Sequence, residues 1–337
     1  MATVVTATSL TLMDWAKRVD PNGKIDKITE MMNKVNEVLD DMVVVEGNTT
    51  TGHKTTIRTG LPTIAWRQIN QGVQPTKSTT KQIEFSCGLL EGLGQVDEEL
   101  VNIALDKQAL RLSENAPNIE SIAQTLATTI FYGNTAVNPE RFTGLTPYYS
   151  ASTGIDAAAN VIKAGGVGSD NTSVWLVVWG EQTIHAFFPK GSKAGIEHND
   201  LGKMLVEDGI TTGAKFMAWV DQYKAKLGLV VRDWRYAVRI CNIDVSDLAT
   251  ARATTDTSAN ICRLMIQAMN LIPNLRAGKA AFYCNKEVKT GLDIQVFNKS
   301  NAFLSISDIE TGHPVTKFMG IPVRRCDAIS NAETLVS

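Results

Sequence analysis

Apolar residues between Lys24 and Met42 recur at steps of three and four, which places them on one face of a helix. The six positions are Ile25, Ile28, Met32, Val35, Leu39 and Met42. The stripe is too short for a coiled coil, because it spans fewer than three heptads. We therefore predict a helix over 24–42 that packs, through Val35 and Leu39, against its own body or an adjacent subunit.

Start and stop signals mark further helices. Acidic residues at Asp97–Glu99 suit the positive end of a helix that runs to about Arg111. A second helix is predicted from Pro117 to Tyr132, with Gly133 as its stop. Three others are predicted over Ser9–Ala16, Asp156–Gly165 and Thr255–Ile272.

The second half of the chain contains strand patterns. Strands are predicted over 173–179, 183–188, 215–226, 229–240, 280–285 and 315–326, with a loop over 190–202. The strands at 215–226 and 229–240 read as an antiparallel pair, in which Arg232 interrupts an apolar face and is expected to pair with an acid. Helices and strands alternate without a regular βαβ rhythm, which indicates an α+β fold.

The segment from Gly47 to Ser86 differs from the rest, because it contains ten threonines and few large apolar side chains. Threonine favours extended backbone, and the glycines and prolines supply turns, so a long two-stranded arm is predicted. An isolated hairpin is marginal in water and needs a neighbour. A disordered insertion is the alternative, but alternating apolar residues and Trp66 fit it less well. We expect Arg58, Trp66, Arg67 and Ile83 to contact a different subunit.

The composition of the chain limits the classes of function that it can have. The chain has 337 residues, 44% hydrophobic and 20% charged, which is typical of a globular protein with a substantial core. A net charge of −2 argues against nucleic-acid binding as a main task. The sequence contains no signal-peptide pattern and no apolar run long enough to span a bilayer. The five widely spaced cysteines predict buried free thiols in a reducing cytoplasm and no zinc site.

Three short motifs match those of serine β-lactamases and penicillin-binding proteins. They are Ser78–Lys81 (SxxK), Ser169–Asn171 (SDN) and Lys289–Gly291 (KTG). Ser78 lies in a threonine-rich stretch predicted as strand, whereas SxxK requires a helix. Lys289 lies in a stretch predicted as a helix that Gly291 ends, whereas KTG requires a strand. We interpret the matches as chance, and a serine acyltransferase remains the alternative function.

Other candidate sites carry weaker signals. The glycines of 165–168 follow a predicted helix, so they read as a connector rather than a phosphate loop. His185 alternates with apolar residues and reads as a core histidine. His198 and Asp200 hold a metal only if distant ligands converge on them. We therefore predict no catalytic residues, no cofactor and no metal.

Several stretches resemble the major capsid proteins of tailed double-stranded DNA phages. VVVEGN at 43–48 precedes a strand, a turn and a returning strand, which is similar to the extended loop of that family. Phe131–Asn134 followed by Pro139–Leu145 is similar to the turn after the family's spine helix, and Phe318–Val323 resembles its closing strand. The segments 168–180 and 228–248 look closest to capsid proteins of short-tailed phages related to a Bordetella phage.

The resemblance implies the HK-97-like (Johnson) fold. It places an N-terminal arm at 1–46, the extended loop at 47–96, a peripheral domain with the spine helix at 97–150, an axial domain at 151–280, and a return to the peripheral domain at 281–337. Some members of the fold are circularly permuted, so these boundaries stay open.

The resemblance also implies a function and partners. The expected function is a structural subunit that self-assembles, as hexamers and pentamers, into the icosahedral head shell around the genome. The expected partners are a portal, a separate scaffolding protein, a cement or decoration protein, and packaged DNA through weak nonspecific contact. The expected location is the virion, after assembly in the host cytoplasm, and no membrane is involved.

Overall fold

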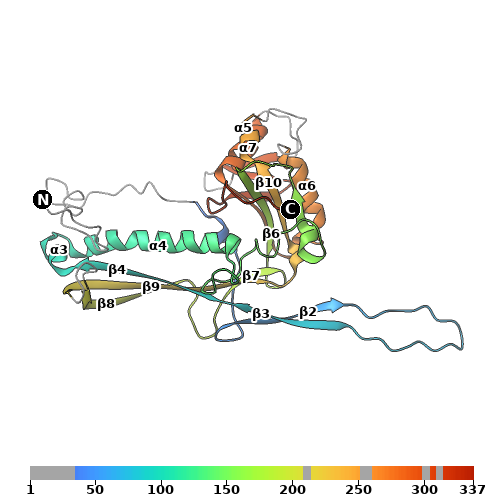
Figure 1. Ribbon diagram of the computed structural model, residues 1–337, viewed down its shortest axis with the longest axis horizontal. Coiled ribbons are helices and arrows are strands. Elements are labelled where there is room, and N and C mark those ends of the chain that lie inside the picture. The colour runs from blue at the N-terminus through green and yellow to red at the C-terminus, as the bar shows by residue number, and fades with distance from the viewer. Residues whose placement is uncertain (1–34, 208–213, 251–259, 298–303, 309–313) are drawn as a thin grey trace. The chain divides into compact units, whose positions relative to one another are not determined.

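The computed structural model describes residues 35–207, 214–250, 260–297, 304–308 and 314–337 (Figure 1). The chain divides into two compact units. The first unit contains residues 89–126 and the described parts of 193–226, and the second contains 35–88, 127–192 and the described residues from 227 onward. The predicted helix over Ser9–Ala16, residues 24–34 and the start of the helix predicted from Thr255 lie outside the described residues.

The first unit is a helix packed on strands. Strand β8 (Ile196–Glu207) pairs antiparallel with β9 (Lys215–Val231), and β4 (Gly88–Asp97) lies next to β9. Helix α3 (Glu98–Ile103) follows β4 and leads to α4 (Lys107–Tyr132). One apolar cluster gathers Ile122 and Leu126 of the helix with residues of the strands, and a second gathers around Leu110. The loop predicted over 190–202 is wrong from Ile196 onward, where β8 begins.

The long helix corrects two predicted helix boundaries. The chain leaves the helical conformation at Ala104, and Asp106 then starts α4, since its Oδ1 accepts hydrogen bonds of 3.0 Å from the backbone N–H groups of Gln108 and Ala109. The helix continues through Pro117, whose ring lies on an exposed side. Packing on both sides of the proline outweighs the loss of one backbone hydrogen bond.

The second unit is built around strand β6 (Asn171–Trp179), all nine residues of which are buried. It lies antiparallel between β10 (Ala237–Asp244) and β11 (Lys279–Cys284). Further strands extend the sheet beside these neighbours: β5 (Val161–Lys163), β14 (Ile321–Arg325), β13 (Pro314–Phe318) and β12 (Leu304–Asp308). Strand β7 (Ile184–Phe188) joins the end of β6 at Trp179, and β1 (Val44–Glu46) pairs parallel with β7.

Both faces of β6 are covered, which explains its continuous apolar sequence. On one face Val174, Leu176 and Val178 pack with residues of α6 (Ile261–Leu271) and α7 (Lys286–Phe297). On the other face Trp175 contacts the rings of Phe131 and Tyr149. The short elements of the unit are α2 (Val38–Asp41), η1 (Asp156–Asn160), η2 (Trp234–Tyr236), α5 (Val245–Thr250) and η3 (Leu275–Ala277).

The antiparallel pair predicted at 215–226 and 229–240 is wrong. Strand β9 continues through Gly228 to Val231, and β10 pairs with β6 and β5 instead. A Cβ at Gly228 would lie 2.3 Å from the Phe187 ring, so the glycine serves close packing rather than a turn. The chain turns only at Asp233–Tyr236, where Asp233 accepts a hydrogen bond from the Arg235 N–H.

The predicted helix over 24–42 is also corrected where the structure describes it. Val35 and Asn36 are not helical, and within 35–42 only Val38–Asp41 is. The Val35 carbonyl accepts from the Asp327 N–H at 2.9 Å, and Asn36 forms a β-bridge with Cys326. Backbone pairing with the chain after β14 therefore replaces the predicted helical turns.

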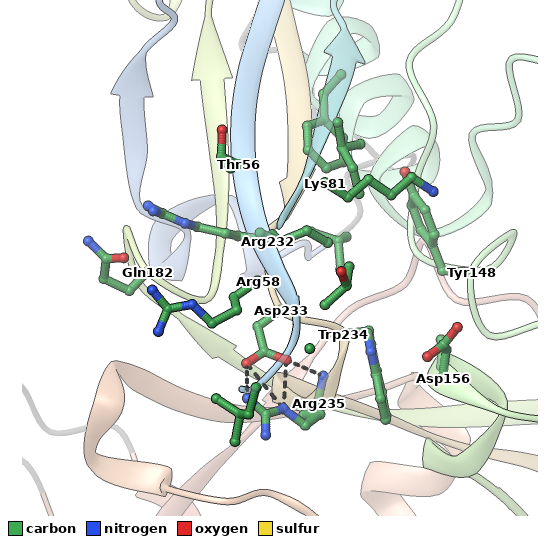
Figure 2. Close-up of a pocket in the computed structure, with 18 residues that line it drawn as sticks. Thr56, Arg58, Lys81, Tyr148, Asp156, Gln182, Arg232, Asp233, Trp234 and Arg235 are labelled. Atoms are coloured by element: carbon green, nitrogen blue, oxygen red, sulfur yellow. Dashed lines mark hydrogen bonds and ion pairs between the residues drawn. The ribbon is translucent and has the colours of Figure 1, made fainter. Parts of the chain in front are cut away.

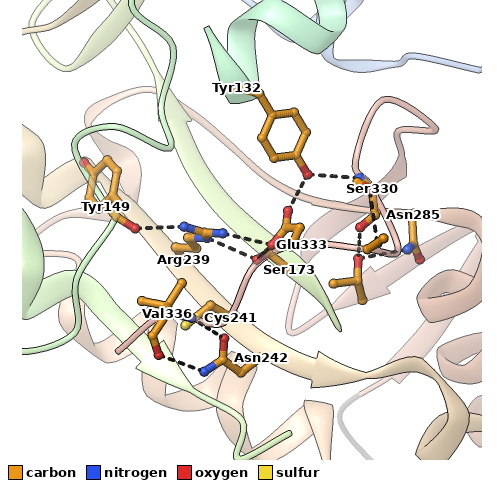
Figure 3. Close-up of polar contacts among 12 residues, drawn as sticks. Tyr132, Tyr149, Ser173, Arg239, Cys241, Asn242, Asn285, Ser330, Glu333 and Val336 are labelled. Atoms are coloured by element: carbon orange, nitrogen blue, oxygen red, sulfur yellow. Dashed lines mark hydrogen bonds and ion pairs between the residues drawn. The ribbon is translucent and has the colours of Figure 1, made fainter. Parts of the chain in front are cut away.

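A buried polar network joins the C-terminal segment to the core of the second unit (Figure 3). The Arg239 guanidinium lies 2.9 Å from Glu333 and donates to the Tyr149 carbonyl at 3.0 Å, with both charged side chains only 3–4% exposed. Ser173 and Tyr132 also donate hydrogen bonds to Glu333. Burial and the nearby Glu333 carboxylate raise the pKa of Tyr132, so the hydroxyl remains a donor.

We expect Glu333→Ala to lower the free energy of unfolding by about 3–5 kcal/mol, because it leaves the Arg239 charge buried without its partner. The matched control is Glu84→Ala. Its ion pair with Lys54 is about half exposed, and its loss should cost less than about 1 kcal/mol. Urea titration of the unassembled chain measures both. Equal effects of the two substitutions would contradict the structural role given to Glu333.

Candidate assembly surface

An arm of two strands extends from the second unit. Strand β2 (Gly52–Gly60) pairs antiparallel with β3 (Thr79–Ser86), from Gly52 opposite Ser86 to Gly60 opposite Thr79, with a register shift between Arg58 and Gly60. The predicted two-stranded arm is thus confirmed over these strands. Asn48 fixes its start, since its side chain accepts from the Lys54 N–H at 2.8 Å and donates to the Lys54 carbonyl at 2.6 Å.

The base of the arm is held by apolar contacts. Phe85 of β3 packs with Phe187 of β7 and Val230 of β9, and Ile83 and Cys87 border this cluster. Ile83 therefore packs at the base of the arm within its own chain, and its contact with a different subunit stays a prediction. A Cβ at Gly52 would lie 2.3 Å from the Phe85 carbonyl oxygen, so the strands approach closely there.

The connecting loop, residues 61–78, exposes large apolar side chains. Trp66 is fully exposed, and Ile64, Ile69 and Leu61 are 90%, 89% and 81% exposed, with Val73 about half exposed. Two hydrogen bonds lie within the loop, from Thr76 to the Thr63 carbonyl and from the Gln71 N–H to the Gln68 carbonyl. This chain therefore leaves the apolar surface of the loop to solvent.

The other predicted interface residues lie at separate places. Arg67 lies in the exposed loop, and Arg58 is exposed on β2. Val35 is 42% exposed, while Leu39 on α2 is half-buried. The segment that carries them is tied to the body, because the buried Asp41 accepts from Tyr283 at 3.0 Å and pairs with Lys279 at 2.6 Å.

A groove of about 980 Å³ runs between the arm and the body of the second unit (Figure 2). Its walls include Arg58 and Lys81 from the arm and Arg232, which directly follows β9. Asp233 and Arg235, also in the groove, pair with each other at 2.7 Å. Arg232 forms no ion pair with any residue in the described ranges, so the acidic partner expected for it from the sequence is not found there. No sequence signal placed Arg232 beside Arg58, because they lie 174 positions apart.

Two histidines meet at the base of the arm. The rings of His53 on β2 and His185 on β7 lie 5.6 Å apart, edge to face, and the Nδ1 atom of each is buried without a hydrogen-bond partner. Burial, followed by the neighbouring His53, lowers the pKa of His185 to about 4, and a hydrogen bond with the Gly180 backbone opposes the shift only partly. The prediction that His185 belongs to the core is confirmed, but one ring nitrogen is left unsatisfied.

The β-lactamase-like motifs do not form a site. Ser78 directly precedes β3, and Lys81 lies on that strand, so the helix that SxxK needs is absent there. Lys289 lies on α7, where it donates to Thr316 at 3.1 Å, and the helix continues past Gly291 to Phe297. Within the described part of the chain, no hydrogen bond or ion pair joins one of these motifs to another.

His198 and Asp200 belong to an ion-pair network in the first unit. The buried Asp221 accepts from His198 at 2.9 Å, from Asn115 at 2.7 Å and from Arg111 at 3.0 Å, and Arg111 also pairs with Asp200. A guanidinium at the centre of the acids occupies the place where a cation would bind. Among the described residues, no group of three or more His, Cys, Asp and Glu side chains could hold a metal ion.

The cysteines are free, and four of the five are buried. Burial raises the pKa of Cys284 and Cys326 to about 12 and that of Cys262 to about 11, which disfavours the reactive thiolate. The prediction of buried free thiols is thus confirmed for these three and for Cys241, whereas Cys87 is half-buried. No helix in the described residues is long and apolar enough to cross a membrane.

The comparisons with known proteins give the class of this α+β chain with its apolar-tipped arm: it is a phage head-shell subunit. The chain belongs to the family of major capsid protein GP7, whose model matches residues 20–337. It is 34% identical to a chain in the structure of bacteriophage Epsilon15, over 99% of each chain, with a TM-score of 0.78. No curated protein matches it.

Two further solved structures are similar at lower identity. The bacteriophage JBD30 capsid is 8% identical over 89% of this chain and 93% of that chain, with a TM-score of 0.46. The capsid of the native GTA particle is 9% identical over 67% of this chain and 95% of that chain, also with a TM-score of 0.46. The family and the Epsilon15 match confirm the HK-97-like fold and the function: a structural subunit that self-assembles into the phage head shell.

We expect the histidine pair to make the subunit sensitive to acid. An unfolded histidine has a pKa near 6.5, above the folded value of His185, so the unfolded state binds more protons as the pH falls. The stabilising contribution is complete above about pH 6.5 and is lost as the pH falls towards 4. His185→Gln, which does not titrate, should remove about 1–3 kcal/mol of the stability difference between pH 7.5 and pH 4.5.

Urea midpoints of the unassembled wild type and variant at the two pH values measure this difference. The comparison between the pH values cancels any pH-independent cost of the substitution itself. A variant that loses as much stability on acidification as the wild type would show that His185 does not titrate in this range.

Proposed function

We propose that loop 61–78 lies on an adjacent copy of the subunit and stabilises the shell by burying its apolar side chains there. The observation that supports this most directly is the exposure of Leu61, Ile64, Trp66, Ile69 and Val73 in the single chain. Each such side chain gains about 1.5–3 kcal/mol when it is fully buried, so the five together supply a large driving force for association. A shell closes many such contacts at once, so each one can be weak.

We assign Arg58 and Arg67 to the same interface, because both are exposed along the arm. Ile83 packs at the base of the arm and so holds the arm in place for this interface. Val35 and Leu39 form a second contact on the inner side of the shell. The exposure of Val35 supports this role, although its segment is fixed to its own body.

The domain assignment follows the family resemblance. Residues 1–46 form the N-terminal arm, 47–96 the extended loop, 97–150 the peripheral domain with the spine helix, 151–280 the axial domain, and 281–337 the return to the peripheral domain. The continuous helix Lys107–Tyr132 supports the placing of the spine helix. Copies are expected to form hexamers and pentamers.

The remaining partners are inferred from the role of a head shell. A portal, a scaffolding protein and a cement or decoration protein are expected to bind the shell, and assembly is expected in the host cytoplasm. The subunit acts without catalysis. Its relatives are expected to include capsid proteins of short-tailed phages related to a Bordetella phage.

Replacing residues 60–77 with an Asn-Gly turn should leave a folded, soluble subunit that forms no closed shells, because the loop contributes little to its own body. A milder variant, Ile64→Ala with Trp66→Ala, should reduce shell yield strongly. Thr63→Ala with Gln74→Ala, on the same loop, is the matched control and should assemble normally. Gradient sedimentation and electron microscopy measure yield, and circular dichroism checks folding.

An unfolded shortened subunit, or normal shells from it, would contradict the role of the loop. A defect as large in the Thr63/Gln74 control as in the Ile64/Trp66 variant would also contradict it, since the apolar side chains would not be responsible.

Contact with packaged DNA is expected to be weak, nonspecific and sharply reduced by salt, because the chain carries a net charge of −2. Binding of the unassembled subunit to two unrelated duplexes of equal length, measured at about 50 and 200 mM salt, tests this. Equal, weak binding that falls steeply with salt is the expected result. Tight and sequence-selective binding at the higher salt concentration would contradict it.

A further inference from the structure

The arm and the rest of the chain carry opposite charge. Residues 47–86 contain five basic residues, Lys54, Arg58, Arg67, Lys77 and Lys81, and one acid, Glu84. The whole chain has 33 basic and 35 acidic residues, so the part outside the arm carries a net charge of −6. The near-neutral total of −2 therefore hides a basic arm on an acidic body.

Three basic side chains, Arg58, Lys81 and Arg232, line the groove between the arm and the body. Figure 2 draws them with Gln182 and Tyr148, which line it too. None of the three cations forms an ion pair with a residue that the structure describes. Lys54, which lies outside the groove on the same strand as Arg58, is paired with Glu84 at 3.3 Å.

The groove contains two acids, and neither pairs with these cations. Asp233 is held by Arg235 through hydrogen bonds of 2.7–3.2 Å. Asp156 lies beside Trp234, away from the two guanidinium groups (Figure 2). Apolar side chains such as Ile57, Phe85 and Trp234 also line the groove. A ligand that fits would carry carboxylates and also offer apolar surface, as a peptide segment does.

We infer that this groove receives an acidic segment of a second copy of the chain, with carboxylates on Arg58, Arg232 and Lys81. The inference rests on the proposed function, because a neighbour that covers loop 61–78 comes close to the stem of the same arm. The charge difference between arm and body supplies the complementarity. A basic site on one face and an acidic segment on another make the contact head-to-tail, the kind that closes into rings.

Zero-length cross-linking of assembled shells tests the inference. Full-length chains labelled with ¹⁴N and with ¹⁵N are mixed, assembled without nucleic acid and treated with a carbodiimide, which joins an amine to a carboxylate as an amide with loss of water. Lys81 should appear in peptides that combine the two labels, joined to Asp or Glu. Lys54 is the matched control and should link to Glu84 of its own chain. Shells in which Lys81 links only within one chain, or not at all, would overturn the inference.

Charge reversal gives an independent measurement. Arg58→Glu with Lys81→Glu leaves the apolar loop intact and should reduce shell yield about tenfold or more. Arg58→Lys with Lys81→Arg keeps the charges and should restore assembly, and circular dichroism checks that both variants fold. Normal assembly of the Glu variant would overturn the inference while leaving the proposed role of the loop intact. Assembly that requires DNA or another polyanion in the wild type would also overturn it, because the cations would then serve that ligand.

Discussion

The arm keeps its direction because three apolar side chains pack where three strands meet. Phe85, Phe187 and Val230 come from β3, β7 and β9, and the contact requires that residue 228 have no side chain. A two-stranded hairpin has no second layer of its own, so its stem depends on this cluster for burial. This cluster, together with the hydrogen bonds of Asn48, anchors the stem that carries the exposed loop and one wall of the groove.

The same unit shows what full burial of a sheet demands. Because both faces of β6 are covered, any polar group beside it needs a partner inside the protein. Arg239 and Glu333 satisfy each other, and Ser173, Tyr132 and the Tyr149 carbonyl take up the remaining hydrogen-bonding capacity. The histidine pair is the contrast, since each ring leaves one buried nitrogen unpartnered. The buried polar groups beside β6 are thus satisfied within the protein. The groups expected to respond to a fall in pH lie at the base of the arm.

Features governed by local pattern could be predicted from the sequence. The arm followed from its threonines, and the strands predicted over 173–179 and 183–188 correspond to β6 and β7. The errors arose where distant contacts decide. Pro117 suggested a helix start, but packing around Leu110 and Ile122 carries α4 through it. The antiparallel pair predicted at 215–226 and 229–240 required a turn between them, but the chain stays extended there and Gly228 makes room for the Phe187 ring.

The candidate surface was predictable to the same extent. Exposure of Trp66 and Arg67 followed from a segment that cannot bury its own side chains. The groove, in contrast, depends on Arg232 and Arg58 lining the same space, and no local sequence pattern encodes that.

The net charge of the whole chain was also a poor guide, because it sums over regions of opposite charge. A value of −2 suggests that charge contributes little to association, yet a basic arm on an acidic body makes attraction between copies directional. Such a subunit gains specificity from charge without the mutual repulsion that a large net charge imposes on many packed copies.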